Sequence, residues 1–176
     1  RRSRYTIEMN VAELICAAYI SLMLPNADVA CEHMETVVEA SDQNYIDPTV
    51  LVSLIYVESR WNAGAVSKSN ACGLTQVIPR YSAGRKNRFG QKLACRDLKD
   101  PTVSIHRGAR VLNFWYHKYA RKNLKQALCG YSKGFRCKEK NPPRKIGMRY
   151  AHKVMKLTRK IRRKIRILQQ SKMDNQ

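Results

Sequence analysis

The chain has 176 residues, which is enough for about one domain that buries its own core, and 44% of them are hydrophobic. Eight glycines and six prolines exclude a low-complexity or collagen-like chain. The net charge of +21 is unevenly spread: residues 1–50 carry 3 basic and 8 acidic residues, and residues 51–176 carry 31 and 5. Such a charge indicates a polyanionic partner or environment.

The first 30 residues allow two interpretations. Residues 11–24 are largely apolar and follow a basic start, which fits the core of a signal peptide or anchor. Glu8 and Glu13 argue against a signal peptide, and the apolar run is short for a membrane span. We therefore favour a helix of the mature protein over about residues 6–24, followed by a second helix over about residues 31–44.

Asp47 and Pro48 predict the start of a third helix, because aspartate caps a helix and proline fits its first position. This helix runs through an apolar segment to Glu58, and Asn62 and Gly64 indicate its end.

The middle of the chain is predicted to hold loops and two further helices. Residues 80–99 read as a long basic loop. Asp100 and Pro101 repeat the capping signal and begin a helix to about residue 120. A short helix follows over about residues 123–131.

A long basic helix is predicted from Pro142 onward. Its apolar residues recur at steps of three and four and form one stripe: Ile146, Tyr150, Val154, Leu157, Ile161, Ile165 and Leu168. From residue 136 to residue 166, 14 of 31 residues are basic and only Glu139 is acidic. Because like charges at four-residue spacing repel, a polyanion such as DNA, teichoic acid or anionic lipid would stabilise this face. The alternative is a solvated helix face.

The six cysteines are an even number, which permits full pairing without requiring it. Cys129 and Cys137 bracket a turn-rich stretch, so we expect a disulfide between them. The chain has no Cys-x-x-Cys pair and its four histidines are scattered, so neither a zinc site nor a cofactor is predicted.

Glu58 is the only carboxylate between Asp47 and Asp97. Apolar neighbours can bury it and raise its pKa, which makes a glutamate a useful proton donor at neutral pH. Glycosidases usually add a second carboxylate at about 5 Å or at about 6.5–9.5 Å. Here Asp47 and Asp100 are better explained as helix caps, so a single-carboxylate acid/base site is expected. The alternative is a surface glutamate.

Around Glu58 the chain resembles the soluble lytic transglycosylases (the SLT, goose-lysozyme-like family). Four blocks match in order: Glu-Ser-Arg-Trp-Asn at 58–62, Ala-Val-Ser at 65–67, Ala-Cys-Gly-Leu-Thr-Gln at 71–76 and Ala-Leu-Cys-Gly-Tyr-Ser-Lys-Gly at 127–134. A looser fifth block spans residues 149–154. The resemblance covers about residues 30–157. It implies a mainly α, lysozyme-like domain over residues 31–141, with an extended basic C-terminal helix over 142–176 whose first part completes the domain.

The resemblance further implies cleavage of peptidoglycan glycan strands. Glu58 would act first as acid and then as base, while the 6-hydroxyl of N-acetylmuramic acid closes a 1,6-anhydro ring. Six other residues would bind substrate: Ser67, Thr75, Gln76, Tyr131, Ser132 and Tyr150. Thr75 replaces the usual methionine and Ser132 the usual asparagine, and Tyr150 would help to place Glu58. The serine, glutamine and tyrosines could instead be ordinary loop and core residues.

Cys72, next to Gly73, and Cys95 downstream could form a structural disulfide flanking the cleft. A catalytic thiol is not expected, because no histidine lies in a matching motif. Two other functions remain open: a hydrolytic lysozyme, and a phage virion component whose basic helix binds DNA or virion proteins. A wall-remodelling subunit of a secretion apparatus is a further context. The expected location is extracytoplasmic, in the periplasm or cell wall, or within a virion.

Overall fold

The computed structural model describes residues 9–138 and 142–173, which are mainly α-helical and contain no β-strand. The α-helices are α1 (Val11–Ser21), α2 (Ala27–Glu32), α3 (Met34–Gln43), α4 (Pro48–Ser59), α5 (Cys95–Leu98), α6 (Pro101–Asn113), α7 (Leu124–Lys133) and α8 (Pro142–Met173). Short helical turns lie at Pro79–Tyr81, Arg85–Asn87, Phe114–Tyr119 and Gly134–Lys138. The prediction of a mainly α fold is confirmed.

Several predicted boundaries were wrong. The helix expected over residues 31–44 is divided between α2 and α3, because His33 leaves helical geometry at φ −102°. The helix expected to reach residue 120 ends as α6 at Asn113 and continues as a π-helical turn. The helix expected from residue 6 begins at Val11, and residues 6–8 lie outside the described range.

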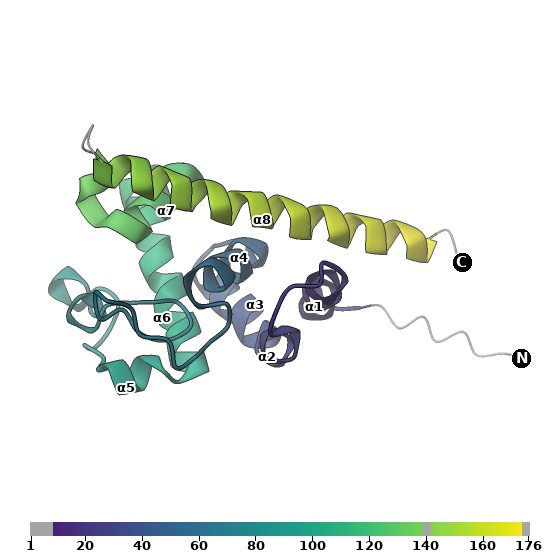
Figure 1. The fold of residues 1–176 in the computed structure, drawn as a ribbon, viewed down its shortest axis with the longest axis horizontal. Helices are drawn as coiled ribbons and strands as arrows, with labels where there is room; N and C mark the ends of the chain where they lie inside the picture. The colour runs from purple at the N-terminus through teal and green to yellow at the C-terminus, as the bar shows by residue number, and fades with distance from the viewer. Residues whose placement is uncertain (1–8, 139–141, 174–176) are drawn as a thin grey trace, which may run out of the picture.

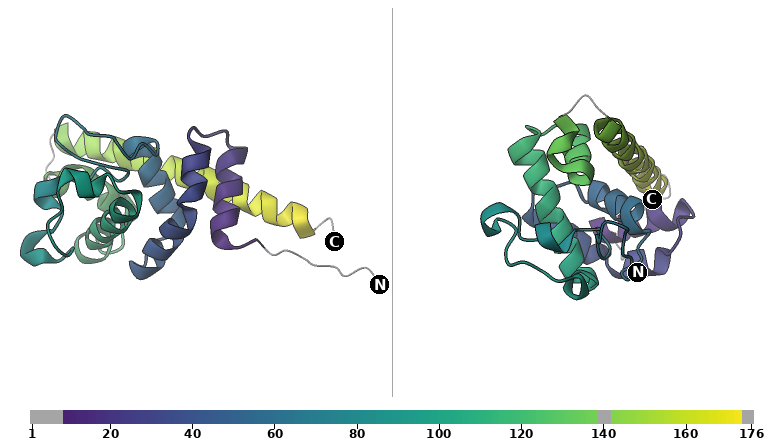
Figure 2. Two further views of the ribbon diagram at one scale, coloured as in Figure 1. Left: turned by 90° about the horizontal axis from the view of Figure 1, so that it is seen from below. Right: turned by 60° about the vertical axis from the view of Figure 1, so that its left-hand side comes forward.

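The long helix α8 runs along one side of the molecule and packs in turn against α7, α4 and α1 (Figure 1). Its C-terminal end projects beyond α1 (Figure 2). The helix α4 is central: every residue from Thr49 to Ile55 is buried. A helix that is buried on all sides must be apolar all round, which explains why α4 lacks a polar face.

Two neighbouring clusters form most of the core. One joins α1, α3, α4 and the distal part of α8 through residues such as Tyr19, Leu51 and Ile161. The other joins α4, α6, α7 and the proximal part of α8 through residues such as Leu54 and Leu128. The two clusters hold α4 in place on both sides, and α4 carries Glu58 in its last turn.

Both ends of α4 are fixed by local chemistry. Asp47 caps the first turn by accepting a hydrogen bond from the amide of Thr49 at 2.8 Å, and Pro48 occupies the first helical position. The helix ends at Ser59, and the next residue, Arg60, adopts the left-handed conformation at φ 52°. The predicted start is confirmed, and the end comes before Asn62.

Three disulfides link the described elements, and no cysteine is free. The expected pairs Cys72–Cys95 and Cys129–Cys137 are confirmed. The third, Cys16–Cys31, joins α1 to α2 and was not predicted. Each closes a loop and so restricts the unfolded chain, which favours the folded state.

Among the described residues, none of the helices combines the length and the hydropathy of a membrane span.

Candidate active site

Glu58 and Tyr150 meet where α4 ends against α8. The hydroxyl of Tyr150 donates a hydrogen bond to Oε1 of Glu58 at 2.6 Å. Burial raises the pKa of Glu58 from 4.5 to about 7, although the hydrogen bond from Tyr150 and the positive charge of Lys133 act in the opposite direction. Near neutral pH the protonated and ionised forms of Glu58 are therefore present in comparable amounts, which suits a group that must both donate and accept a proton.

Tyr131 reaches the same region from α7. Its hydroxyl donates to the backbone carbonyl of Thr75 at 2.7 Å. Burial, followed by the nearby charge of Glu58, raises the pKa of both Tyr131 and Tyr150 well above 10. Both phenols therefore stay neutral and act as hydrogen-bond donors at neutral pH.

The loop between α4 and the short helix Pro79–Tyr81 is hydrogen-bonded to the end of α4. The Ser59 hydroxyl donates to the carbonyl of Leu74 at 2.8 Å. The Gln76 amide nitrogen donates to the carbonyls of Ala65 at 3.1 Å and Gly73 at 2.9 Å. This loop therefore has a fixed position relative to Glu58.

Gly73 is required in this loop. It has φ +76°, and a Cβ at this position would lie 1.7 Å from the backbone oxygen of Leu98. An L-residue would be strained at this angle, and its side chain would overlap the backbone. The glycine of the matched motif thus lets the loop pack directly on the end of α5.

The side chain of Thr75 does not face a substrate site. It is fully buried, and its hydroxyl donates to the carbonyl of Ser104 in α6 at 2.8 Å. It also fills the space beside Gly108, where a Cβ would come within 2.5 Å of Thr75. The expectation that residue 75 contacts the glycan through its side chain was therefore wrong, and only its carbonyl belongs to the site, through Tyr131.

Ser67, Gln76 and Ser132 are partly exposed. The Ser67 hydroxyl accepts hydrogen bonds from the amides of Ser69 at 3.2 Å and Ala71 at 3.0 Å, so it shapes the loop. Ser132 follows Tyr131 in α7. Substrate contacts of these three residues remain predictions.

Three other carboxylates that could have acted beside Glu58 serve as helix caps. Asp47 caps α4, Asp97 accepts from the amide of Ala94 at 2.8 Å, and Asp100 accepts from the amide of Val103 at 2.9 Å. Glu139 lies outside the described residues. Within residues 9–138 and 142–173, histidine, cysteine and acidic side chains form no group able to hold a metal ion.

Residues 35–149 match the family described as the transglycosylase SLT domain. The match covers more than half of the chain and includes Glu58, Tyr131 and the loop of Gly73. The chain belongs to the transglycosylase SLT domain family.

Curated relatives of this SLT domain carry related names. A membrane-bound lytic murein transglycosylase C of Haemophilus influenzae (strain PittEE) is 33% identical over 95 residues, which cover 51% of this chain and 26% of that protein. A membrane-bound lytic murein transglycosylase E of Buchnera aphidicola subsp. Acyrthosiphon pisum (strain APS) is 32% identical over 77 residues, which cover 42% of this chain and 35% of that protein. The chain thus spans only a minor part of the length of these relatives.

Two solved structures share the fold of this SLT domain. An inactive mutant of the lytic transglycosylase Slt from Pseudomonas aeruginosa has a TM-score of 0.65 and 17% identity, covering 83% of this chain and 29% of the other. The 70 kDa soluble lytic transglycosylase from Escherichia coli has a TM-score of 0.65 and 16% identity, covering 85% and 29%. The lysozyme-like fold expected from the sequence is confirmed.

Lys133 was not predicted to have a role, yet its charge acts on Glu58 in this SLT domain. Lys133 follows Ser132 at the end of α7, where the chain comes close to α8. Gly147 of α8 permits this approach, because a Cβ there would lie 2.6 Å from the Cys129 sulfur and 3.1 Å from Cγ of Lys133. No sequence signal separates Lys133 from the other basic residues, because its role depends on this packing.

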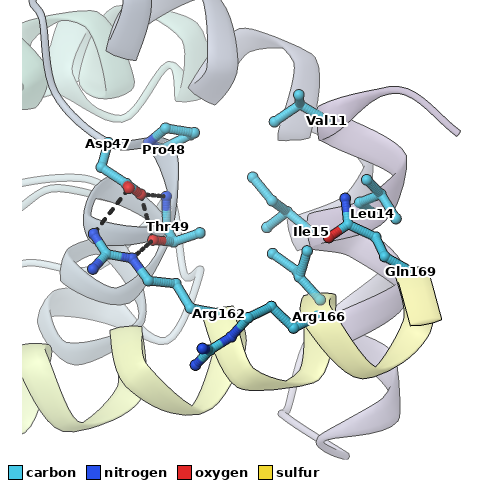
Figure 3. Close-up of a pocket in the computed structure, with 10 residues that line it drawn as sticks. Val11, Leu14, Ile15, Asp47, Pro48, Thr49, Arg162, Arg166 and Gln169 are labelled. Carbon is cyan, nitrogen blue, oxygen red and sulfur yellow. Dashed lines mark hydrogen bonds and ion pairs between the residues drawn. The ribbon is translucent and has the colours of Figure 1, made fainter.

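A pocket of about 400 Å³ lies apart from Glu58, between α1, the start of α4 and the distal part of α8 (Figure 3). Half of the residues that line it are apolar, such as Ile15 and Pro48, and the other half are polar or charged. On one wall, Arg162 donates to the Asp47 carboxylate at 2.8 Å and to the Thr49 hydroxyl at 3.1 Å. The carboxylate of Asp47 is thus already paired, and no residue predicted to bind substrate lines this pocket.

Proposed function

We propose that this chain is a peptidoglycan lytic transglycosylase. It cleaves the β-1,4 bond between N-acetylmuramic acid and N-acetylglucosamine and forms a 1,6-anhydro ring. The observation that carries the proposal is the environment of Glu58. Its carboxyl group accepts a hydrogen bond from Tyr150, and burial raises its pKa to about 7. No second carboxylate contributes to this shift. Membership of the SLT family and the lytic murein transglycosylase names of its relatives support it.

The reaction begins with Glu58 as the acid. Because Tyr150 occupies Oε1, the proton leaves from Oε2 to the glycosidic oxygen as the bond to the muramic acid carbon breaks. A hydrogen bond to a carboxylate stabilises its charged form, so Tyr150 favours the state that proton donation produces. Lys133 acts in the same direction through its positive charge.

Glu58 then acts as the base. Its carboxylate accepts the proton of the muramic acid 6-hydroxyl, whose oxygen bonds to the electron-poor anomeric carbon. Glu58 ends protonated, as it began, and no water is consumed. A single carboxylate is sufficient for this sequence, whereas a glycosidase normally uses two.

The glycan contacts of the site follow as part of the proposal. Gln76 uses its amide nitrogen to hold the loop, so its amide oxygen can accept a hydrogen bond from a sugar hydroxyl or N-acetyl group. The other proposed glycan contacts are Ser67, Ser132 and the ring of Tyr131. Thr75 is not part of it.

Two measurements test the function. Glu58→Gln keeps the size of the side chain but removes the acid, and loss of general acid catalysis lowers the rate by roughly 10²–10⁴-fold. Mass spectrometry of products from purified sacculi should show anhydro-muramyl ends. Products with only hydrated reducing ends would make the protein a hydrolytic lysozyme instead.

We place the working protein outside the cytoplasm. Three disulfides fit an oxidising compartment, where such bonds persist. The virion context rests on the lysozyme-like domain together with the basic helix α8, and both it and the secretion-apparatus context remain predictions. Salt-dependent binding to DNA would favour a virion role.

A further inference from the structure

The side of α8 that faces away from the protein carries a row of cations. Ala151, Val154 and Ile161 are buried against the body of the molecule. On the opposite side, exposed basic residues follow one another at steps of four and three: Arg149, Lys153, Lys156, Lys160 and Arg163. At 1.5 Å per residue this row is about 21 Å long. We call it the outward row.

The charge of the outward row is not neutralised by its own helix. The sequence of α8 contains no aspartate or glutamate. In the described part of the chain, the one ion pair that involves α8 joins Arg162 to Asp47, and it lies on the flank that lines the pocket (Figure 3). Cations spaced at four residues along a helix repel each other, so an anionic surface would stabilise this face.

Exposed aliphatic side chains lie near both ends of the outward row. Ile167 follows Arg163 by four residues and therefore continues the row, and it is 45% exposed. Ile146 lies seven residues before Lys153 and is 44% exposed. Such aliphatic side chains form no favourable interaction with the phosphates of a nucleic acid. The interface of a bilayer accepts aliphatic side chains beside cations, because headgroup and acyl regions lie next to each other.

The position of α8 on the domain favours a flat partner over a groove. The helix packs on α7, α4 and α1, so its inner side is covered except at the C-terminal end, which projects beyond α1 (Figure 1). To read a DNA major groove about 12 Å wide and 8.5 Å deep, a helix must enter it, and the attached domain would obstruct this. A planar surface can contact the whole outward row at once.

We propose that the outward row of α8, with Ile146 and Ile167, binds the surface of an anionic phospholipid bilayer. Tyr150 leaves the same helix on another side and reaches Glu58, so the bilayer contact leaves the candidate active site free. This binding does not depend on the proposed catalytic activity, and it is measured without turnover.

Sedimentation with vesicles tests the outward row. The probe is a mixture of phosphatidylglycerol and phosphatidylcholine in equal parts, compared with pure phosphatidylcholine. The variant replaces Lys156, Lys160 and Arg163 by glutamate. Since each cation near an anionic surface is worth about fivefold in partitioning, we expect at least about 100-fold weaker binding. Pure phosphatidylcholine should bind neither protein.

The matched control replaces three exposed lysines that are not part of α8 by glutamate: Lys68, Lys99 and Lys125. It has the same net charge as the first variant and should keep most of the binding. Circular dichroism and thermal unfolding verify that both variants are folded. If both variants lose binding equally, total charge rather than the outward row is responsible, and the proposal is wrong.

Ile167→Gln tests the apolar part. Salt screens the charges but not the aliphatic contact. The unchanged protein should keep measurable binding to the mixed vesicles at high salt, and this variant should lose it. Duplex DNA added as a competitor should not displace the vesicles. Displacement by DNA at equal phosphate concentration, or unchanged binding by the triple variant, would overturn the proposal.

Discussion

Tyr150 donates a hydrogen bond of 2.6 Å to Glu58 across 92 residues of sequence, and this bond joins the central helix α4 to the long helix α8. It opposes the effect of burial on Glu58, which raises the pKa of the carboxyl group to about 7. The properties of the carboxyl group thus depend on how α8 packs, so each residue that sets its pKa can be tested separately.

Tyr150→Phe removes the hydrogen bond and keeps the ring. The bond lowers the pKa of Glu58, so its loss raises that pKa further. Since Glu58 must begin protonated, activity falls as pH rises through its pKa, and the variant should shift this alkaline limb to higher pH. We also expect kcat to fall about 10–100-fold, the value of a hydrogen bond to a charged group. A pH–rate profile on soluble glycan strands measures both, and an unmoved alkaline limb would contradict the assignment.

Lys133→Met removes the positive charge that acts on Glu58. This charge also lowers the pKa of Glu58, but it ranks after the hydrogen bond from Tyr150. The alkaline limb should therefore move to higher pH by less than in Tyr150→Phe. Lys125→Met, an exposed position on the same helix, serves as the control and should leave the profile unchanged. Equal shifts in both lysine variants would mean that total charge, not position, is responsible.

Glu58→Gln should stabilise the fold in a pH-dependent way. The folded pKa of Glu58 lies above its ordinary value of 4.5, so the folded state binds more protons than the unfolded state between about pH 4.5 and 7. Ionisation of the buried Glu58 therefore lowers the free energy of unfolding as pH rises through this window. Glutamine cannot ionise, so the variant should be more stable by about 1–3 kcal/mol at pH 8 and nearly equal in stability at pH 4. Urea unfolding at the two pH values measures the difference, and a difference of equal size at both would argue against a raised pKa.

Gly73→Ala should destabilise the loop beside the site. The added Cβ would lie 1.7 Å from a backbone oxygen, and alanine would be strained at φ +76°. We expect a loss of about 3 kcal/mol or more in the free energy of unfolding. Gly134→Ala is matched for backbone angle, with φ +61°, but its Cβ meets nothing within 4 Å. It should cost less, about 1–3 kcal/mol, because alanine is strained at φ +61° and ψ −147° but meets no clash. Equal losses in the two variants would show that the backbone angle alone matters.

The sequence predicted the elements whose signals are local. Asp47 and Pro48 correctly indicated the start of α4. The disulfide between Cys129 and Cys137 was also predicted correctly, although the stretch between them is helical rather than turn-rich. The motif around Glu58 also led to Tyr150, which no local pattern connects to it. The Cys16–Cys31 disulfide had no motif and no bracketed turn, so it was not predicted.

The errors occurred where the outcome depends on packing. Thr75 was expected to face the glycan, but the turn after Gly73 directs its side chain toward α6. The π-helical turn after Asn113 breaks the spacing of three and four residues on which helix prediction rests. The role of Lys133 is set by the close approach of α7 and α8 at Gly147, and residue order does not reveal that approach.

The path of α8 also has a consequence for the order in which the protein can assemble. The ribosome makes α8 after the other described helices, yet α8 packs against the first of them, α1, and covers α4 and α7 as well. Until α8 has been made, Glu58 has no Tyr150 and the core around α4 is open on one side. A nascent chain thus carries the carboxyl group but not the tyrosine that holds it, so the complete site forms only after α8 has been synthesised.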